Sequence, residues 1–302
     1  MTTIAPPRAT AAEREFTVAA KTQWQLIRAR FLAHRPAMIG LTILVGLIIA
    51  AYVVPYFYPF KSQAINYNAL SKAPYAHHIL GTDTLGQDLF AEILAGIQTS
   101  FQVALLAVAV GESVGVVIGL VAGFYRGPID SILMRLTDIV LTIPIFVLVA
   151  VLAQVSGGNW WSIALIIGGT AWTVTARLVR SVVLSLRERE YIEAARSLGA
   201  SDSRILFRHL LPNSLGVIVV DSTLNFAAAI LVEAALSFLG FGIHPPRVSL
   251  GGLLTSGVNA AQTRPWLFYF PGIVLVIMVL CVNFVGDGVR DAFDPTANRV
   301  RA

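Results

Sequence analysis

The chain has 302 residues, of which 56% are hydrophobic and only 13% are charged, and its formal net charge is +5. An average soluble domain has roughly 45–50% apolar and about 25% charged residues. The composition therefore excludes an ordinary soluble protein and indicates an integral membrane protein. The basic residues are not interleaved with aromatic ones, which argues against nucleic-acid binding.

The N-terminal segment, residues 1–36, is expected to precede the membrane. Residues 1–15 are rich in Ala, Thr and Pro, which predicts an unstructured tail. Through 16–34, apolar residues recur at spacings of three and four, which indicates a helix lying at the membrane interface, with an ordinary cytoplasmic helix as the alternative. No cleaved signal peptide is expected, because the first apolar run begins after about residue 36 and is long enough to span.

Six later stretches are long and apolar enough to cross a bilayer core of roughly 30 Å, which takes about 20 helical residues. They cover approximately 37–55, 101–123, 138–156, 162–178, 217–241 and 266–286. The predicted fold class is therefore an all-α membrane protein with six transmembrane helices. An even number of crossings places both chain ends on one side.

The distribution of Lys and Arg predicts which side that is, because positive charge near span ends is retained in the cytoplasm. One face carries eighteen of these residues, namely Arg8, Arg14, Lys21, Arg28, Arg30, Arg35, Arg126, Arg135, Arg177, Arg180, Arg187, Arg189, Arg196, Arg204, Arg208, Arg290, Arg299 and Arg301. The other face carries Lys61, Lys72, Arg247 and Arg264. Both termini and the central loop are therefore predicted to be cytoplasmic. The high pI also indicates attraction to anionic lipid.

The external segments are short. Residues 56–100 and 242–265 contain the Gly, Pro, Thr and Asp residues typical of turns and helix caps, and neither is large enough to form a separate catalytic domain. The predicted organisation is a tail (1–36), a first helix with its external loop (37–100), a core of five helices (101–290) and a second tail (291–302).

Four glycines follow one another at a spacing of four in the second predicted span. They are Gly111, Gly115, Gly119 and Gly123. Small residues at this spacing let a second helix approach closely, so we interpret the stripe as a helix-packing face.

Three acidic residues fall inside predicted spans, where a charge costs at least about 2.5 kcal/mol and must face something polar. These are Glu112, Asp221 and Glu233. Asp221 and Asn225 are one turn apart, and Glu233 lies on the same broad half of the helix, so Asp221, Asn225 and Glu233 are candidates for a translocation path. A hydrogen-bonded contact between helices, without a transport role, remains an equal alternative.

Other chemistry finds little support in the sequence. No G-x-x-x-x-G-K-[ST] nucleotide site is present, so any ATP must be handled by another polypeptide. The letters around Ser113 fit G-x-S-x-G, but they fall within a span and no His lies in any span to act as its base. The His77-His78 pair lacks nearby partners, so no metal site is predicted.

Residues 190–213 form a polar, Arg-rich stretch between two apolar segments. Glu193, Ala194 and Ala195 favour a short helix, Gly199 a turn, and Leu211-Pro212 a stop. A segment of this composition must lie outside the bilayer, and it is suited to binding a soluble partner.

This stretch resembles the EAA motif of the inner-membrane permease subunits of ABC importers. Glu193, Ala194, Ala195, Gly199, Leu211 and Pro212 match that motif in type and spacing, whereas His209 replaces its isoleucine. Segments 78–90, 236–246 and 286–295 are similar to conserved segments of the dipeptide, oligopeptide and nickel branch, and the long loop after the first span is like that of its C-type permease.

The resemblance implies a type I ABC importer permease fold in which the EAA residues form a cytoplasmic coupling helix. It implies a non-catalytic subunit of a bacterial cytoplasmic-membrane importer without a cofactor of its own, with ATP and Mg on partner subunits. The implied partners are a second homologous permease, two ATPase subunits or one fused ATPase, and an extracytoplasmic substrate-binding protein. Substrates left open are dipeptides, longer peptides, nickel chelates and other small solutes.

A proton-coupled secondary transporter using Glu112, Asp221 or Glu233 as proton carriers is the main alternative. Such carriers often contain inverted internal repeats, and the sequence contains none. An intramembrane hydrolase rests on Ser113 alone.

Overall fold

The computed structural model describes residues 22–294, and the regular structure in this range is helical. The predicted tail 1–15 and five of the counted cations lie outside it. The helices are α2 (Gln23–Ala33), α3 (Arg35–Phe57), η1 (Tyr67–Ala69), α4 (Leu89–Tyr125), α5 (Gly127–Thr142), α6 (Ile145–Val155), α7 (Trp160–Leu186), α8 (Glu190–Ser197), α9 (Asp202–Arg204), η2 (Ile205–Leu210), α10 (Leu211–Phe238), α11 (Leu250–Val258) and α12 (Trp266–Phe293).

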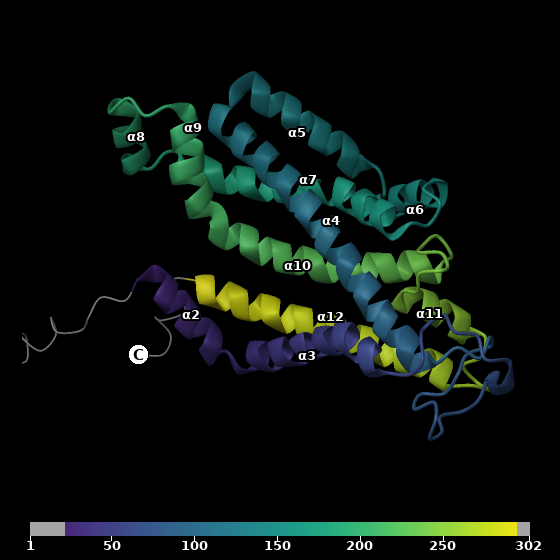
Figure 1. Ribbon diagram of the computed structural model, residues 1–302. Helices are drawn as coiled ribbons and strands as arrows, with labels where there is room; N and C mark the ends of the chain where they lie inside the picture. Colours follow the sequence, from purple (N-terminus) through teal and green to yellow (C-terminus); the bar gives the residue numbers. More distant parts are fainter. Residues whose placement is uncertain (1–21, 295–302) are drawn as a thin grey trace, which may run out of the picture.

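The long helices run back and forth between two ends of an elongated bundle (Figure 1). One end holds α2, α8, α9 and the last residues of α12. The other end holds α6, α11 and the long loop between α3 and α4. Both ends of the described chain therefore lie at the same end of the bundle as α8, as an even number of crossings requires.

The third crossing was predicted as one helix over 138–156. In the structure it is a bent pair of helices, α5 and α6. Five helices are long and apolar enough to span a membrane, and α5 with α6 meets the same test only as a pair bent by 80°. The break falls at Pro144, whose ring disfavours the helical conformation of Ile143, and Ile143 is extended at φ −86° and ψ 131°. Because α4 ends near α8 while α7 begins at the opposite end, α5 carries the chain across and α6 lies beyond the bend (Figure 1).

Charged residues on α5 are paired with α7, which explains how this polar helix fits among the others. Asp130 accepts two hydrogen bonds from Arg180, at 2.5 and 2.6 Å. About two turns further along α5, Asp138 pairs with Arg177. These charged residues lower the hydropathy of α5, and they attach α5 to α7.

The interfacial helix begins at Gln23, and residues 16–21 lie outside the described range. Thr22 caps α2 through a capping box with Gln25. Near the start of α2, the Trp24 ring meets the ring of Phe293 in α12 edge to face, with 6.3 Å between centroids. Near the end of α2, the Arg30 guanidinium donates to the Asp294 carbonyl at 2.8 Å. These contacts place α2 beside the end of α12.

The second crossing is longer than predicted, because α4 begins at Leu89 rather than near residue 101. Asp88 caps its first turn by accepting from the Ala91 amide at 2.8 Å. The residues between 89 and 100 are therefore helical instead of external loop. The second external segment likewise contains a helix, α11.

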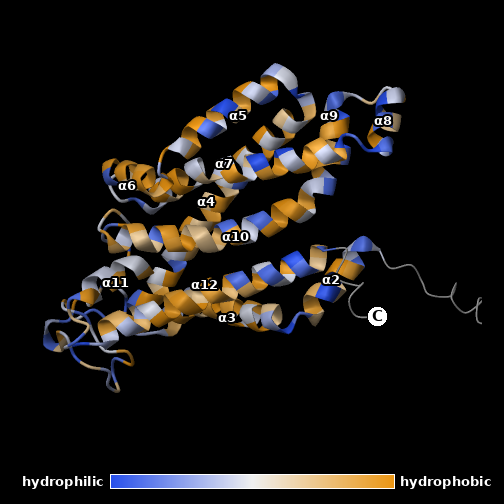
Figure 2. Ribbon diagram, turned by 180° about the vertical axis from the view of Figure 1, so that it is seen from behind, coloured by the Kyte–Doolittle hydropathy of each residue, from blue (hydrophilic) through white to orange (hydrophobic). Residues whose placement is uncertain are grey.

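Apolar side chains form the core around α4, which packs against α3, α5, α7, α10 and α11. The larger buried cluster joins α4 to α6, α7, α10, α11 and α12. A smaller one lies near α8. Apolar residues also cover the outer faces of the long helices (Figure 2), as a lipid environment requires.

The glycine stripe of α4 lies against α7. A Cβ added at Gly115 would lie 2.6 Å from Thr175 Cβ, and one at Gly119 would lie 2.6 Å from the Ala176 carbonyl oxygen. One at Gly123 would lie 2.8 Å from Val183 Cβ, and one at Gly111 3.2 Å from the Gly168 carbonyl oxygen. The two backbones therefore approach more closely than any larger residue would permit.

Replacing Gly119 by Ala should destabilise the protein by about 1–3 kcal/mol, the usual effect of overpacking a close contact. The added methyl group would meet backbone atoms of α7, which cannot move aside as a flexible side chain can. Thermal unfolding in detergent would report the change. Gly169→Ala, on α7 with open space around its Cβ position, is the control, and equal melting temperatures for both variants would contradict the packing role.

Candidate functional site

One side chain of α8 is buried in the bundle. Ile192 is fully buried within the smaller apolar cluster. That cluster includes Leu120 of α4, Val183 of α7 and Leu210 of η2. A displacement of α8 would therefore be transmitted to the ends of three long segments.

The spacing of Ala195 and Gly199 produces a Schellman motif at the end of α8. The Gly199 amide donates to the Arg196 carbonyl and the Ala200 amide to the Ala195 carbonyl, both at 3.0 Å. This closure needs a left-handed residue after the helix, and Gly199 has φ +80°. The predicted short helix and turn are thus present, and Gly199 sets the angle at which the chain leaves α8.

The outer side of α8 is open to solvent. Glu193 and Ala194 are exposed and Ala195 is half-buried. Beside them, the apolar side chain of Leu198 is 88% exposed. Small residues around one projecting apolar side chain form a surface suited to fit a hollow on another protein.

Leu211 and Pro212 do not end a helix, in contrast to the prediction of a stop. They begin α10, which continues η2 without interruption. The preceding turn is π-helical, and the Leu211 amide donates to the Leu206 carbonyl five residues earlier. The widened turn accommodates the proline, which lacks an amide donor.

Basic groups gather where α7 leads into α8. Arg187 donates to the Phe124 carbonyl, Arg126 pairs with Glu188 at 2.6 Å, and Arg196 lies over the Phe124 ring. Partial burial, together with the positive charges of Arg126 and Arg196, lowers the pKa of Arg187. These contacts fix the start of α8 against the end of α4.

A second group of polar residues lies midway along the bundle, between α4, α7 and α10. Asn225 donates to Glu112 at 2.8 Å and to Asp221 at 3.2 Å. The Thr175 hydroxyl donates to Asp221 at 2.7 Å. Asp221 and Asn225, predicted as path residues, thus share a network with Glu112.

Glu233 belongs to a different network. It is fully buried and accepts from Ser100 and Ser237, both at 2.8 Å. The Ser249 hydroxyl in turn donates to Ser237 at 3.1 Å. These contacts join α10, α4 and the start of α11. They are of the kind expected if Glu233 makes a hydrogen-bonded contact between helices, which was the alternative to a place in the translocation path.

The opposite end of the bundle is held by a buried pair. His78 Nδ1 lies 2.7 Å from Asp88 Oδ2, and the Tyr58 hydroxyl donates to the same oxygen at 3.1 Å. Burial and the neighbouring Asp88 raise the pKa of Tyr58.

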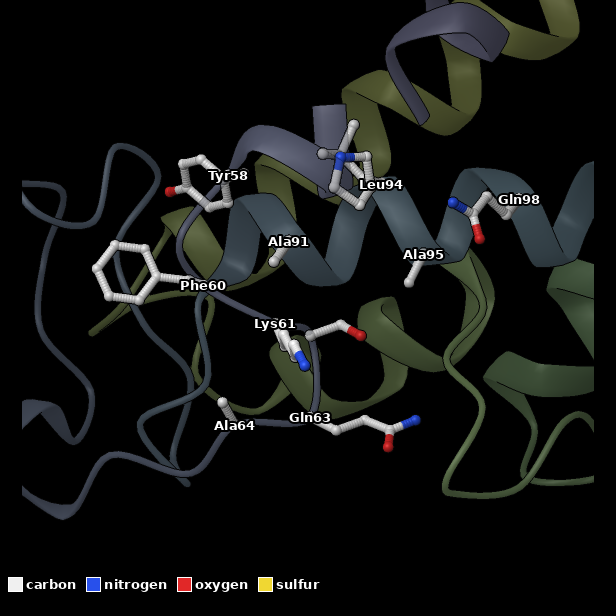
Figure 3. Close-up of a pocket in the computed structure, with 11 residues that line it drawn as sticks. Tyr58, Phe60, Lys61, Gln63, Ala64, Ala91, Leu94, Ala95 and Gln98 are labelled. Atoms are coloured by element: carbon white, nitrogen blue, oxygen red, sulfur yellow. The ribbon is translucent and has the colours of Figure 1, made fainter. Parts of the chain in front are cut away.

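Beside this pair, a cavity of about 510 Å³ lies between α4 and the loop after α3 (Figure 3). Ala91, Ala95 and Lys61 line it.

Hydrolytic and metal chemistry gain no support from residues 22–294. Ser113 is exposed and donates to the Ala109 carbonyl of its own helix at 2.6 Å. Within this described part of the chain, no three His, Cys, Asp or Glu side chains are grouped so as to hold a metal ion.

Sequence reasoning missed three residues that the structure places at these sites: Ile192, Leu198 and Thr175. Ile192 and Leu198 lie within the EAA stretch, and only the fold distinguishes the buried apolar residue from the exposed one. Thr175 and Asp221 are 46 residues apart in the sequence, so no local pattern connects them.

Comparison with known proteins identifies two matching families. The family described as binding-protein-dependent transport system inner membrane component matches residues 115–299. The N-terminal transmembrane domain of oligopeptide transport permease C matches residues 22–74.

Curated relatives match along nearly the whole chain. The oligopeptide transport system permease protein OppC of Mycobacterium tuberculosis is 40% identical over 278 residues, covering 91% of this chain and 96% of the relative. OppC of Escherichia coli is 41% identical, covering 92% and 93%. A putative peptide permease protein of Brucella suis is 42% identical, covering 89% of each.

Among solved structures, the MetNI methionine ABC transporter in an inward-facing conformation has a similar fold, with a TM-score of 0.52 at 20% identity. The match covers 67% of this chain and 96% of that one. It agrees with the predicted ABC permease fold. The extent of the family match and of the close relatives shows that the chain belongs to the family of binding-protein-dependent transport system inner membrane components, the non-catalytic, multi-pass permease subunits of such systems.

Proposed function

We propose that this chain is the C-type permease of an oligopeptide importer and that α8 is the helix through which a cytoplasmic ATPase drives it. The main support is the construction of α8, which is anchored by buried Ile192 and exposes Ala194 and Leu198. The relatives named as oligopeptide permeases support the substrate class. Glu193, Ala194, Ala195 and Gly199 would form the docking element, with Leu211 and Pro212 joining it to α10.

The orientation follows from charge. The end of the bundle that holds α2, α8 and the last turn of α12 carries most of the arginines, so we place it in the bacterial cytoplasm. The end with α11 and the His78–Asp88 pair would then face the substrate-binding protein. Both chain termini are cytoplasmic in this arrangement.

Further subunits complete the proposed assembly. A second, homologous permease would supply the other half of the translocation path, and two ATPase subunits, or one fused ATPase, would bind ATP and Mg. A substrate-binding protein would deliver the peptide. To reverse a 1:99 balance between two permease conformations takes about 5.5 kcal/mol of differential binding, so the contact at α8 must be firm.

Replacing Leu198 by Ser should weaken ATPase binding without destabilising the permease. The side chain is 88% exposed, so its removal should change the free energy of unfolding by no more than about 0.5 kcal/mol. Loss of a projecting contact residue at an interface costs on the order of 1–2 kcal/mol, or about tenfold or more in affinity. Pull-down of the partner ATPase by the purified permease measures the effect.

Leu198→Met is the matched control, because it keeps an apolar side chain of similar volume. An unaltered affinity in Leu198→Ser would argue that the ATPase does not bind at this surface. Copurification of a single chain only, with uptake that survives ATP depletion but not collapse of the proton gradient, would instead favour the proton-coupled transporter.

Replacing Gly199 by Val should uncouple transport while leaving the spans folded. The space around Gly199 is open, so the effect comes from its backbone alone. A β-branched residue is poorly tolerated at φ +80°, whereas Asn adopts this conformation more readily. Peptide uptake by proteoliposomes should fall about tenfold or more in Gly199→Val, a factor equal to about 1.4 kcal/mol. It should remain near the wild-type value in Gly199→Asn, and equal uptake by both variants would count against a role for this turn.

A further inference from the structure

Glu112 has a carboxylate oxygen that lacks a partner although the residue is buried. Its side chain is 9% exposed. Oε1 accepts from Asn225, but Oε2 has no hydrogen-bond partner among the described residues. A buried polar atom of this kind costs about 1–3 kcal/mol unless something else binds it, so the free oxygen needs an explanation.

Glu112 also lines a cavity. The space measures about 160 Å³ and is lined by residues of α4, α6, α7 and α10. Apart from Glu112, Thr170 and Asn225, its walls are apolar, and most of the wall residues are small or aliphatic. The hydroxyl of Thr170 is already used within its own helix, where it donates to the Ile167 carbonyl at 2.9 Å. Glu112 is the acidic residue among those that line this cavity.

The network around Glu112 has two acids and no base. Asp221 is joined to Glu112 through Asn225, and neither carboxylate is paired with a Lys, Arg or His among residues 22–294. The nearest arginines along α7, Arg177 and Arg180, are engaged by α5. A membrane-embedded acidic pair of this kind favours a cation as its missing partner.

The polar groups that line the cavity restrict which cation could bind there. It offers one or two carboxylate oxygens and an amide, too few oxygen ligands for Ca²⁺ or Mg²⁺. A primary ammonium group has three N–H donors that rotate about one bond, so a few acceptors are enough to bind it. The apolar walls would accommodate the carbon atoms attached to it.

We propose that Glu112, held by Asn225, binds the α-ammonium group of a peptide in transit through the bundle. This inference rests on the proposed function as an oligopeptide permease. The α-ammonium group is present in every peptide with a free N-terminus, whatever its side chains. A carboxylate directed at it, in a cavity with small apolar walls, would therefore guide peptides without selecting among their sequences.

A protection assay tests the proposal directly. The chain is assembled with its partner subunits in nanodiscs, with Cys281→Ser to remove the native thiol and Val174→Cys at the cavity wall, where the side chain is 52% exposed. The rate of thiol modification is measured with a tripeptide at millimolar concentration and with the same tripeptide N-acetylated. The free tripeptide should slow modification severalfold, and the acetylated one should not.

Glu112→Gln should abolish this protection and lower uptake of the free peptide about tenfold, the size of one lost charge-assisted hydrogen bond. Glu112→Asp should restore part of both. Ser113→Ala, at the neighbouring exposed position, should behave as the wild type. Protection that persists in Glu112→Gln, equal protection by both peptides, or none by either would overturn the proposal and leave Glu112 as a protonated packing residue. Failure of the chain to assemble with a second permease and an ATPase would instead contradict the proposed function.

Discussion

The close contact between α4 and α7 is the constraint on which the rest of the structure depends. Without side chains at Gly115, Gly119 and Gly123, the two backbones meet along much of their length. Lipid offers apolar side chains no advantage in associating with one another, so van der Waals packing of this kind holds membrane helices together. The contact also determines chemistry, because it brings Thr175 of α7 to the level of Glu112 on α4 and hence joins both to Asp221.

The same pair of helices connects the two functional regions. The ends of α4 and α7 that lie near α8 supply Leu120 and Val183 to the cluster that holds Ile192 of α8. Further along, they enclose the cavity that Glu112 lines. In the proposed mechanism, a displacement of α8 would reach the walls of this cavity through α4 and α7, whose backbones are in close contact.

Much of this organisation could be predicted from the sequence because it depends on local patterns. Hydropathy located five of the crossings, and the spacing of Gly111 to Gly123 predicted a packing face. The run from Glu193 to Ala195 predicted a short helix, and Gly199 predicted its turn. The errors have physical causes. The charges of α5 are compensated by Arg177 and Arg180, residues some 40 to 50 positions away, whereas hydropathy placed the third span at 138–156. Pro212 looked like a stop because the π-helical turn that accommodates it leaves no signature in composition.

The acids show most clearly where sequence reasoning ends. Asp221, Asn225 and Glu233 lie on one helix and were grouped on that basis, yet they belong to two networks that also include residues of other helices. Glu233 is satisfied by serines of α4 and α10, whereas Glu112 keeps a free oxygen. Both are buried carboxylates in one bundle, and only the hydrogen bonds distinguish them. A satisfied acid fixes the contact between helices, whereas the unused oxygen of Glu112, a residue that lines a cavity, is the reason we propose it as the binding group for a passing ammonium.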